Sequence, residues 1–254
     1  MEKVVARINA AEEDVGKSEL FSVVLSELGH LDLSHIICLA LGSPESSSAA
    51  RYQLALVKNI VDKLEISPSK VFLYDPVFTD TDKRVICSLG YRLESLEQAV
   101  KSCEEGSTKE TKEETKEETK QSETKANDTP TRILYFLPHA SLELTEEVLS
   151  QYHAHYLLAN DAIAHTDRLT TRKLYDNYRV LSYLVSLTDQ PSVDTQFQSV
   201  KKKRRQRTKV FVEPKLDFSA DKMHFNSTTI KRLPTEGPWD NAFTDLAFHK
   251  LGYK

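Results

Sequence analysis

The stretch that decides the fold is IICLALGSP, residues 36–44. Its first six residues are all apolar, which is typical of a central parallel strand that is buried on both faces. Gly42, Ser43 and Pro44 then end the strand at a turn. Beyond this turn, apolar residues recur three and four positions apart up to residue 64, which predicts a helix over residues 47–64.

The same alternation continues along the chain. Further strands are predicted at residues 71–74, 91–93, 132–137 and 155–159. Helices are predicted at residues 18–28, from Thr79 to Gly90, after a cap at Ser141, and as one long helix over 174–185. This order indicates an α/β fold: a single Rossmann-like, open and mostly parallel sheet with helices on both faces. Extra C-terminal β strands are predicted at the sheet edge, at residues 210–212 and 229–233.

A charged segment interrupts this pattern at residues 101–129. It contains a near-repeat of Thr-Lys-Glu-Glu and almost no apolar side chains. Such a composition cannot contribute to a core, so the segment is predicted to be a disordered insert within one domain that spans residues 1–254.

The composition gives some indication of the cellular compartment of the protein but does not indicate its binding partner. The net charge of -4 is too small to predict a partner, and no window approaches the 18 apolar residues of a membrane span, so no membrane association is expected. The three cysteines lack the spacing of a zinc site. Cys38 and Cys87 are predicted to be buried free thiols, which fits the reducing cytosol.

A basic run, KKKRRQR, occupies residues 201–207. It could act as a nuclear-localisation or polyanion-binding patch, or as a solvated charge run that faces the insert. No aromatic residues are interleaved with it for base stacking, so nucleic acid is not the expected partner.

Polar residues follow the predicted strands. Gly42-Ser43, Asp75, His139 and Asn160-Asp161 each stand where a strand ends. Ligands of open parallel sheets bind beyond the carboxyl ends of the strands, so this rim is the candidate site. Polar turn and cap residues at strand ends would produce the same pattern, and both interpretations stay open.

The turn after the first strand also raises the question of a cofactor. A class I methyltransferase would have a glycine-rich loop there and an acidic residue after the second strand, where Asp75 stands. However, Gly42 is the only glycine of the loop, and Pro44 removes a backbone donor. The signature is weak, and the cofactor stays unknown.

Three residues at the start of the second helix are candidates for ligand binding. Arg51 could reach the rim and hold a phosphate or a carboxylate, although a solvated arginine is the simpler interpretation. Tyr52 follows it, and the amide of Gln53 borders the apolar stripe and needs a partner if it is buried.

Two further positions carry histidines. His139 follows Pro138 at a strand exit, which suits a general base, a metal or haem ligand, or a turn residue. Asp245 and His249 are four positions apart and would share one face of a helix or a strand, so the carboxylate could orient the imidazole. Because no nucleophile is identifiable, this pair is interpreted as structural or supporting, and whether the protein is an enzyme stays open.

Four segments together resemble the sensitivity-to-red-light-reduced (SRR1-like) family and its fungal benomyl-resistance (Ber1-like) branch. They are LALGSPESSSAARYQLAL (39–56), VFLYDPVF (71–78), ILYFLPHA (133–140) and FTDLAFH (243–249). The chain departs from the family pattern at Ala140, where a cysteine is frequent, and at Thr244, where an asparagine is usual.

The resemblance implies a Rossmann-like regulatory protein of the cytoplasm and nucleus, with protein partners and a possible small-molecule or haem ligand. Relatives are associated with light and circadian signalling in plants, and with microtubule-related or haem-related processes in fungi and animals. The family has no agreed catalytic mechanism. Its motif positions that serve as candidate ligand-binding residues here are Gly42, Ser43, Arg51, Tyr52, Gln53, Asp75, His139, Asp245 and His249.

Overall fold

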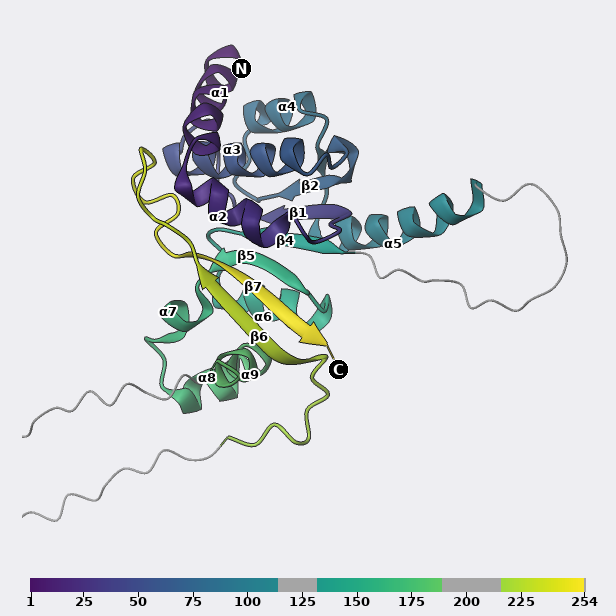
Figure 1. The fold of residues 1–254 in the computed structure, drawn as a ribbon, viewed down its shortest axis with the longest axis vertical. Coiled ribbons are helices and arrows are strands. Elements are labelled where there is room, and N and C mark those ends of the chain that lie inside the picture. Colours follow the sequence, from purple (N-terminus) through teal and green to yellow (C-terminus); the bar gives the residue numbers. More distant parts are fainter. Residues whose placement is uncertain (114–131, 189–215, 254) are drawn as a thin grey trace, which may run out of the picture.

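Seven strands form one sheet within residues 1–113, 132–188 and 216–253, which the computed structural model of the chain describes. Their order across the sheet is β3-β2-β1-β4-β5-β7-β6 (Figure 1). The strands are β1 (His35–Leu39), β2 (Val71–Tyr74), β3 (Arg92–Leu93), β4 (Ile133–Leu137), β5 (Tyr156–Asn160), β6 (Phe225–Arg232) and β7 (Leu246–Tyr253). Strands β1 to β5 are parallel, and β7 is antiparallel to both β5 and β6. The predicted mostly parallel α/β sheet with extra C-terminal strands is confirmed.

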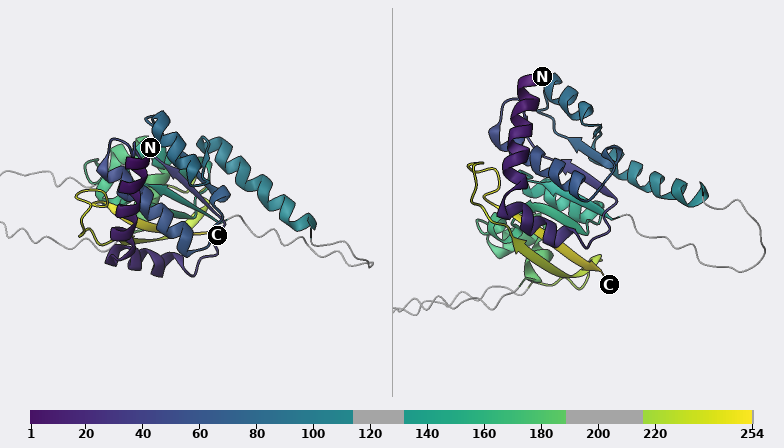
Figure 2. Two further views of the ribbon diagram at one scale, coloured as in Figure 1. Left: turned by 90° about the horizontal axis from the view of Figure 1, so that it is seen from above. Right: turned by 45° about the horizontal axis from the view of Figure 1, so that its top comes forward.

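Helices cover both faces of this sheet (Figure 2). One face packs against α1 (Glu2–Gly16), α2 (Glu19–Leu28), α3 (Ser48–Lys63) and α4 (Asp80–Ser88). The other packs against α5 (Leu96–Glu113), α6 (Leu142–Gln151), α7 (Ala162–Thr166), α8 (Thr171–Asn177) and α9 (Arg179–Ser186). A short 3-10 turn, η1 (Pro68–Lys70), precedes β2. Among the described residues, no helix combines the length and apolar character needed to cross a lipid bilayer.

Strand β1 shows why an unbroken apolar run forms the centre of the sheet. Ile36 and Cys38 contribute to the core on one face, and Ile37 and Leu39 to the core on the other. Successive side chains of a strand point to opposite faces, so a strand with helices on both sides needs apolar residues at every position. All five residues of β1 are buried.

The predicted helix starts are confirmed by their caps. The side chains of Ser18, Ser47 and Ser141 each accept a hydrogen bond from the backbone N–H three residues later. Thr79 and Asp82 form a reciprocal capping box at α4. These bonds satisfy N–H groups that a helix leaves unpaired at its start, and both partners lie within one turn of sequence.

Other expectations are corrected. Cys87 is exposed because α4 turns Val85 and Ile86 inward instead, whereas Cys38 is buried as predicted. Helix α1 was not predicted, although its buried residues follow helical spacing; they are Val4, Ile8, Ala11 and Val15. The single helix predicted over 174–185 is two helices, because the backbone leaves the α region at Tyr178.

The charged segment is described only in its first part. Helix α5 continues to Glu113, so residues 101–113 are helical, and this helix leads away from the sheet (Figure 1). The rest of the predicted insert, the basic run 201–207 and the predicted strand 210–212 lie outside the described residues.

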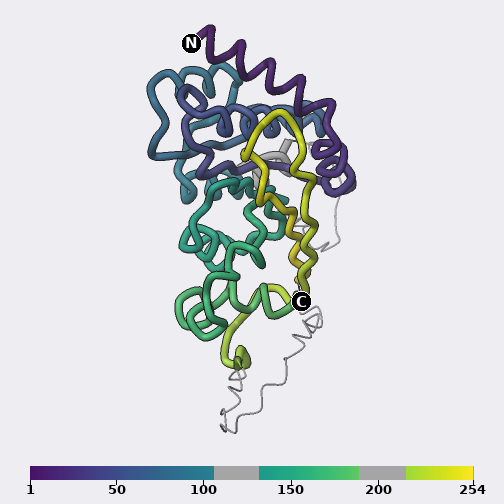
Figure 3. Tube along the Cα trace, turned by 90° about the vertical axis from the view of Figure 1, so that its left-hand side faces the viewer, coloured from purple at the N-terminus to yellow at the C-terminus, as the bar shows by residue number. Residues whose placement is uncertain are grey.

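The connection between β6 and β7 brings the C-terminal part of the chain to the N-terminal helices. Figure 3 shows this connection, in yellow, passing over them. Trp239 is buried there, with its ring edge-on to Tyr52 of α3 at a centroid distance of 6.1 Å. Segments from both sides of the charged insert therefore share one core.

Candidate functional site

The strand order creates a topological switch point between β1 and β4. From β1 the chain moves outward to β2 and β3, and from β4 it moves in the opposite direction to β5. Ligands of open α/β sheets bind in the crevice that forms at such a point, at the carboxyl ends of the strands. Gly42, Asp75 and His139 follow β1, β2 and β4, and Asn160 is the last residue of β5, so all four stand at strand ends as predicted.

A direct hydrogen bond joins the first two of these loops. The Gly42 N–H donates to Oδ2 of Asp75 at 2.8 Å, and the Val77 N–H donates to Oδ1 of the same carboxylate at 2.9 Å. Gly42 has a φ of 77°, a left-handed conformation that glycine adopts without steric cost. Each Asp75 oxygen keeps further acceptor capacity for a ligand.

The backbone at Ala40 is strained. Its φ is 54°, in the left-handed region that favours glycine, and it lies where β1 passes into the loop. A Cβ atom in this conformation is too close to the following carbonyl oxygen. The loop geometry at the rim is therefore imposed by the surrounding packing rather than by the preference of this residue.

We expect Ala40→Gly to raise the free energy of unfolding by about 0.5–1 kcal/mol, because glycine relieves the left-handed strain. Ala49→Gly in α3 is the matched control. The same change in a helix should lower stability, because glycine loses more conformational entropy there. Urea denaturation of both variants would check the pair. A destabilised Ala40→Gly protein would contradict this account of the loop.

A second contact braces the loop after β1. Asp82 is fully buried and accepts hydrogen bonds from the N–H groups of Glu45 at 2.8 Å and Thr79 at 3.0 Å. Ser43 is also buried, and its Oγ accepts a 3.4 Å hydrogen bond from the Ser46 N–H. These two side chains therefore hold the loop in shape, and neither lines the pockets described below.

Arg51 and Tyr52 have structural contacts. The Arg51 guanidinium donates to the Pro44 carbonyl oxygen at 2.9 Å, so it holds the loop after β1. The Tyr52 hydroxyl donates to Asp14 Oδ2 of α1 at 3.0 Å. Both side chains are therefore hydrogen-bonded to other parts of the protein itself.

Gln53 connects His139 to the C-terminal segment. Its fully buried Nε2 donates to the Ala242 carbonyl oxygen at 2.7 Å and lies 2.9 Å from Nε2 of His139. Because the amide nitrogen is a donor, Nε2 of His139 must accept, and the imidazole proton is assigned to Nδ1. Burial also lowers the pKa of His139, although the Asp75 carboxylate opposes this effect. His139 is therefore a neutral imidazole at the rim.

Asp245 and His249 are not paired. His249 lies in β7 and is buried, and its Nε2 accepts a 3.2 Å hydrogen bond from the Ala162 N–H. Asp245 is exposed just before β7, and its carbonyl oxygen accepts from the Asp161 N–H at 2.6 Å. The four-residue spacing therefore does not create a carboxylate–imidazole contact here.

Two hollows lie along the strand ends. The first, which we call the strand-end pocket, has a volume of about 560 Å³. It is lined by Leu39, Ala40, Tyr74, Asp75, Pro76, Ser95, Leu96, Glu97, Ser141, Leu144, Glu147 and Tyr152. The second, the histidine pocket, has a volume of about 430 Å³ and is lined by His139, Asn160, Ala164, His165, Asp167, Arg168 and Asp245. Of the predicted residues, Asp75 lines the first pocket, and His139 and Asp245 line the second.

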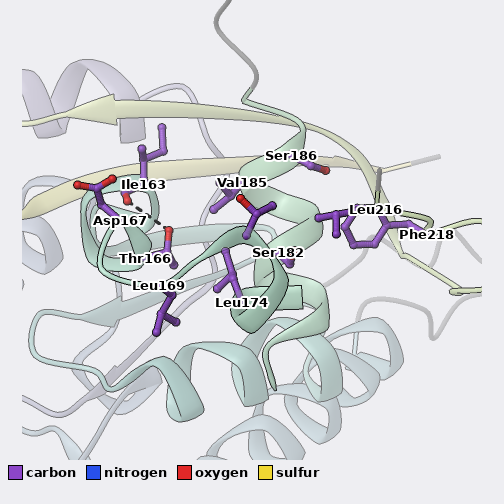
Figure 4. Close-up of a pocket in the computed structure, with 11 residues that line it drawn as sticks. Ile163, Thr166, Asp167, Leu169, Leu174, Ser182, Val185, Ser186, Leu216 and Phe218 are labelled. Atoms are coloured by element: carbon purple, nitrogen blue, oxygen red, sulfur yellow. Dashed lines mark hydrogen bonds between the residues drawn. The ribbon is translucent and has the colours of Figure 1, made fainter. Parts of the chain in front are cut away.

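A hollow of about 630 Å³ lies elsewhere, between α7, α8, α9 and residues 216–218 (Figure 4). Apolar and polar residues contribute to its walls in similar proportion, and the Thr166 hydroxyl in them donates a hydrogen bond to the Ile163 carbonyl oxygen at 3.2 Å. None of the predicted site residues lines it, so the switch-point rim remains the candidate site.

Several lining residues were not predicted. Ser95 and Glu97 follow the short strand β3, so the rule that ligands bind at strand ends could have found them. Glu147 and Tyr152 come from the side and end of α6, where no sequence pattern marks them. In the described part of the chain, no three His, Cys, Asp or Glu side chains gather in a way that could hold a metal ion.

These features define a Rossmann-like α/β protein with a ligand-sized pocket at its switch point. The chain belongs to the SRR1 domain family, whose model matches residues 15–250. An SRR1-like protein of Mus musculus is 26% identical over 164 residues, which are 61% of this chain and 55% of the mouse protein. The alignment therefore spans about half of that relative. No solved structure matches the chain.

Proposed function

We propose that this SRR1-domain protein is a regulatory protein that responds to a small molecule bound in the strand-end pocket. The observation that carries the proposal is the hollow of about 560 Å³ at the switch point, bounded by the Asp75 carboxylate that Gly42 holds in place. Its volume falls in the range of about 300–1,000 Å³ that small-molecule sites occupy.

The lining supports the same conclusion. Leu39, Leu96 and Leu144 provide apolar surface, and Tyr74 and Tyr152 add aromatic rings. Tyr74 is 47% exposed although it is large and aromatic. Small-molecule sites combine such apolar walls with a few fixed polar groups, a role that Asp75 fills here.

A group-transfer enzyme is the alternative. The strand order β3-β2-β1-β4-β5-β7-β6, with β7 antiparallel, is also the order of class I methyltransferases. A neutral His139 lines the histidine pocket on the same rim and could exchange a proton with a second substrate. A fold alone does not assign an activity, so turnover that is lost in a folded His139→Ala variant would be needed to favour this alternative.

The resemblance to relatives supports further proposals about the setting. We infer that the protein acts through protein partners in the cytoplasm and nucleus, and that it belongs to the fungal benomyl-resistance branch. Light or circadian signalling, microtubule-related processes and haem-related processes are the candidate pathways for it.

We expect at least one compound of a panel of S-adenosylmethionine, nucleotides, dinucleotides and haem to raise the thermal stability of the protein. A ligand at 100 times its Kd stabilises the folded state by about 2.7 kcal/mol. Tyr74→Ala should weaken this ligand about tenfold or more, because an aromatic ring that stacks on a ligand contributes about 1–3 kcal/mol.

Val77→Ala is the matched control, because Val77 is 58% exposed and does not line the pocket. It should leave the Kd unchanged. A panel without any stabilising compound, or a ligand whose Kd is the same in Tyr74→Ala, would refute the proposed function.

A further inference from the structure

We propose that the strand-end pocket selects an organic cation of nucleoside size and rejects anionic forms of the same nucleoside. This inference rests on the proposed function, because it names the ligand class of that site. It extends that function from binding of some small molecule to recognition by charge.

All the charged side chains that line the strand-end pocket are acidic. Asp75, Glu97 and Glu147 line the pocket, whereas none of its lining residues is a lysine, an arginine or a histidine. Among the described residues, none of these three carboxylates forms a salt bridge. A ligand that enters therefore meets negative charge that no salt bridge within the described part of the chain neutralises.

Tyr152 shows that two of these carboxylates act at the same place. Burial raises the pKa of the Tyr152 hydroxyl, and the charges of Glu147 and Glu97 raise it further. Glu147 belongs to α6 and Glu97 to α5, so the two helices bring their carboxylates to one wall. A positive group in this position would be attracted by both, and a phosphate would be repelled by both.

The helix starts at the pocket do not reverse this sign. Helices α5 and α6 both begin beside it, and a helix start carries about half a positive charge. One N–H group near each start has a side-chain partner: the Ser95 N–H, just before α5, donates to Gln98 Oε1 at 3.2 Å, and the Leu144 N–H, the third of α6, donates to Ser141 Oγ at 3.2 Å. Full carboxylate charges therefore outweigh the partial charges of the two helix starts.

The remaining chemistry of the wall fits a nucleoside. Each Asp75 oxygen accepts one backbone N–H and can accept one hydroxyl more, which suits the neighbouring hydroxyls of a ribose. Acidic residues after the second strand of dinucleotide-binding folds bind ribose in this way. The rings of Tyr74 and Tyr152 can stack on a base or lie against a cation.

Three compounds that share the adenosine group isolate the effect of charge. S-adenosylmethionine carries a sulfonium cation, S-adenosylhomocysteine is the thioether that lacks this one positive charge, and ATP is an anion. We expect calorimetric titration of the full-length protein to show S-adenosylmethionine binding at least tenfold more tightly than S-adenosylhomocysteine, with ATP weakest. The preference for the sulfonium should shrink at high salt, because salt screens exposed charges.

Variants link the preference to the pocket. Glu97→Gln and Glu147→Gln should each reduce the affinity ratio of the sulfonium to the thioether several-fold, while the affinity for the thioether changes little. Glu104→Gln is the control, because Glu104 is exposed on the same helix as Glu97 and does not line the pocket. It alters net charge equally and should leave the ratio unchanged.

The outcomes separate this inference from the proposed function. Equal or tighter binding of the thioether or of ATP, or no binding of all three compounds, would overturn the charge selectivity. A different compound of the wider panel that binds and depends on Tyr74 would still support the proposed function. If Glu104→Gln lowers the ratio as much as the pocket variants do, the effect is one of net charge and the inference is wrong.

Discussion

Replacing Trp239 with alanine should lower the free energy of unfolding by about 3–5 kcal/mol, as for other buried large aromatic residues. Trp239 is 1% exposed, and its ring packs edge-on to Phe243 at a centroid distance of 5.2 Å. Its Nε1 donates to the Thr235 carbonyl oxygen at 3.1 Å. The substitution would leave a large cavity between the C-terminal connection and the N-terminal helices.

The neighbouring residues provide a second variant and a control. A Cβ atom at Gly237 would lie 2.2 Å from the indole ring, so Gly237→Ala should displace Trp239 and destabilise the protein without removing the ring. Glu236→Ala, at an exposed position, should change stability by less than about 0.5 kcal/mol. Urea unfolding of the three variants measures these effects. A loss below about 1 kcal/mol for Trp239→Ala would show that this connection is not part of the core.

The second large effect is expected with pH. His249 is 2% exposed, its Nδ1 has no hydrogen-bond partner among the described residues, and burial lowers its pKa to about 4. The Asp161 carboxylate and the nearby backbone of Leu157 and Ala247 oppose this effect only in part. An unfolded histidine titrates near pH 6.5, so between about pH 6.5 and 4 the unfolded chain binds more protons than the folded chain.

Stability should therefore be fully present above pH 6.5 and fall as the pH decreases toward 4, by about 3 kcal/mol from His249 alone. Burial lowers the pKa of His155 and His224 to about 4 as well, so both add to the same trend. His249→Gln keeps an acceptor for the Ala162 N–H but does not titrate, and it should flatten the pH dependence. Urea unfolding at intervals from pH 7 to 4 measures the slope.

The exposed His30 provides the control for this experiment. His30→Gln should leave the slope of stability against pH unchanged. If His249→Gln and the unmodified protein lose the same stability between pH 6.5 and 4, the buried imidazole is not the source of the acid sensitivity.

Local features of the fold were predictable because their causes lie within a few residues. An apolar run such as Ile36 to Leu41 allows few structures other than a buried strand, and Ser47 or Thr79 can cap only the helix that follows it. Helix α1 could also have been predicted, since Val4, Ile8, Ala11 and Val15 repeat with helical spacing. The position of the rim followed from the order of strands and helices alone.

Contacts between distant segments were not predictable in this way. The Glu146 carboxylate of α6 accepts hydrogen bonds from the Val180 and Leu181 N–H groups, both at 2.8 Å, and so provides a start for a new helix after Tyr178. The sequence around Tyr178 has an uninterrupted helical pattern, so it gives no sign of the break between α8 and α9. The Glu146 carboxylate, at which α9 begins, lies more than thirty residues earlier in the chain.

The candidate site likewise has features that were predictable from the sequence and features that were not. Asp75 and His139 could be identified from the residues around them, because each stands directly after an apolar strand. That Arg51 holds the loop after β1 while Glu97 and Glu147 face a common pocket could not be read from the sequence, since a side chain's partners depend on which helices pack together. Local hydrophobic pattern thus specifies the strands and the rim, and the Ser and Thr residues before the helices specify the caps. The charge of the pocket arises only when α5 and α6 fold onto one face of the sheet, because electrostatic fields act through space and not along the chain.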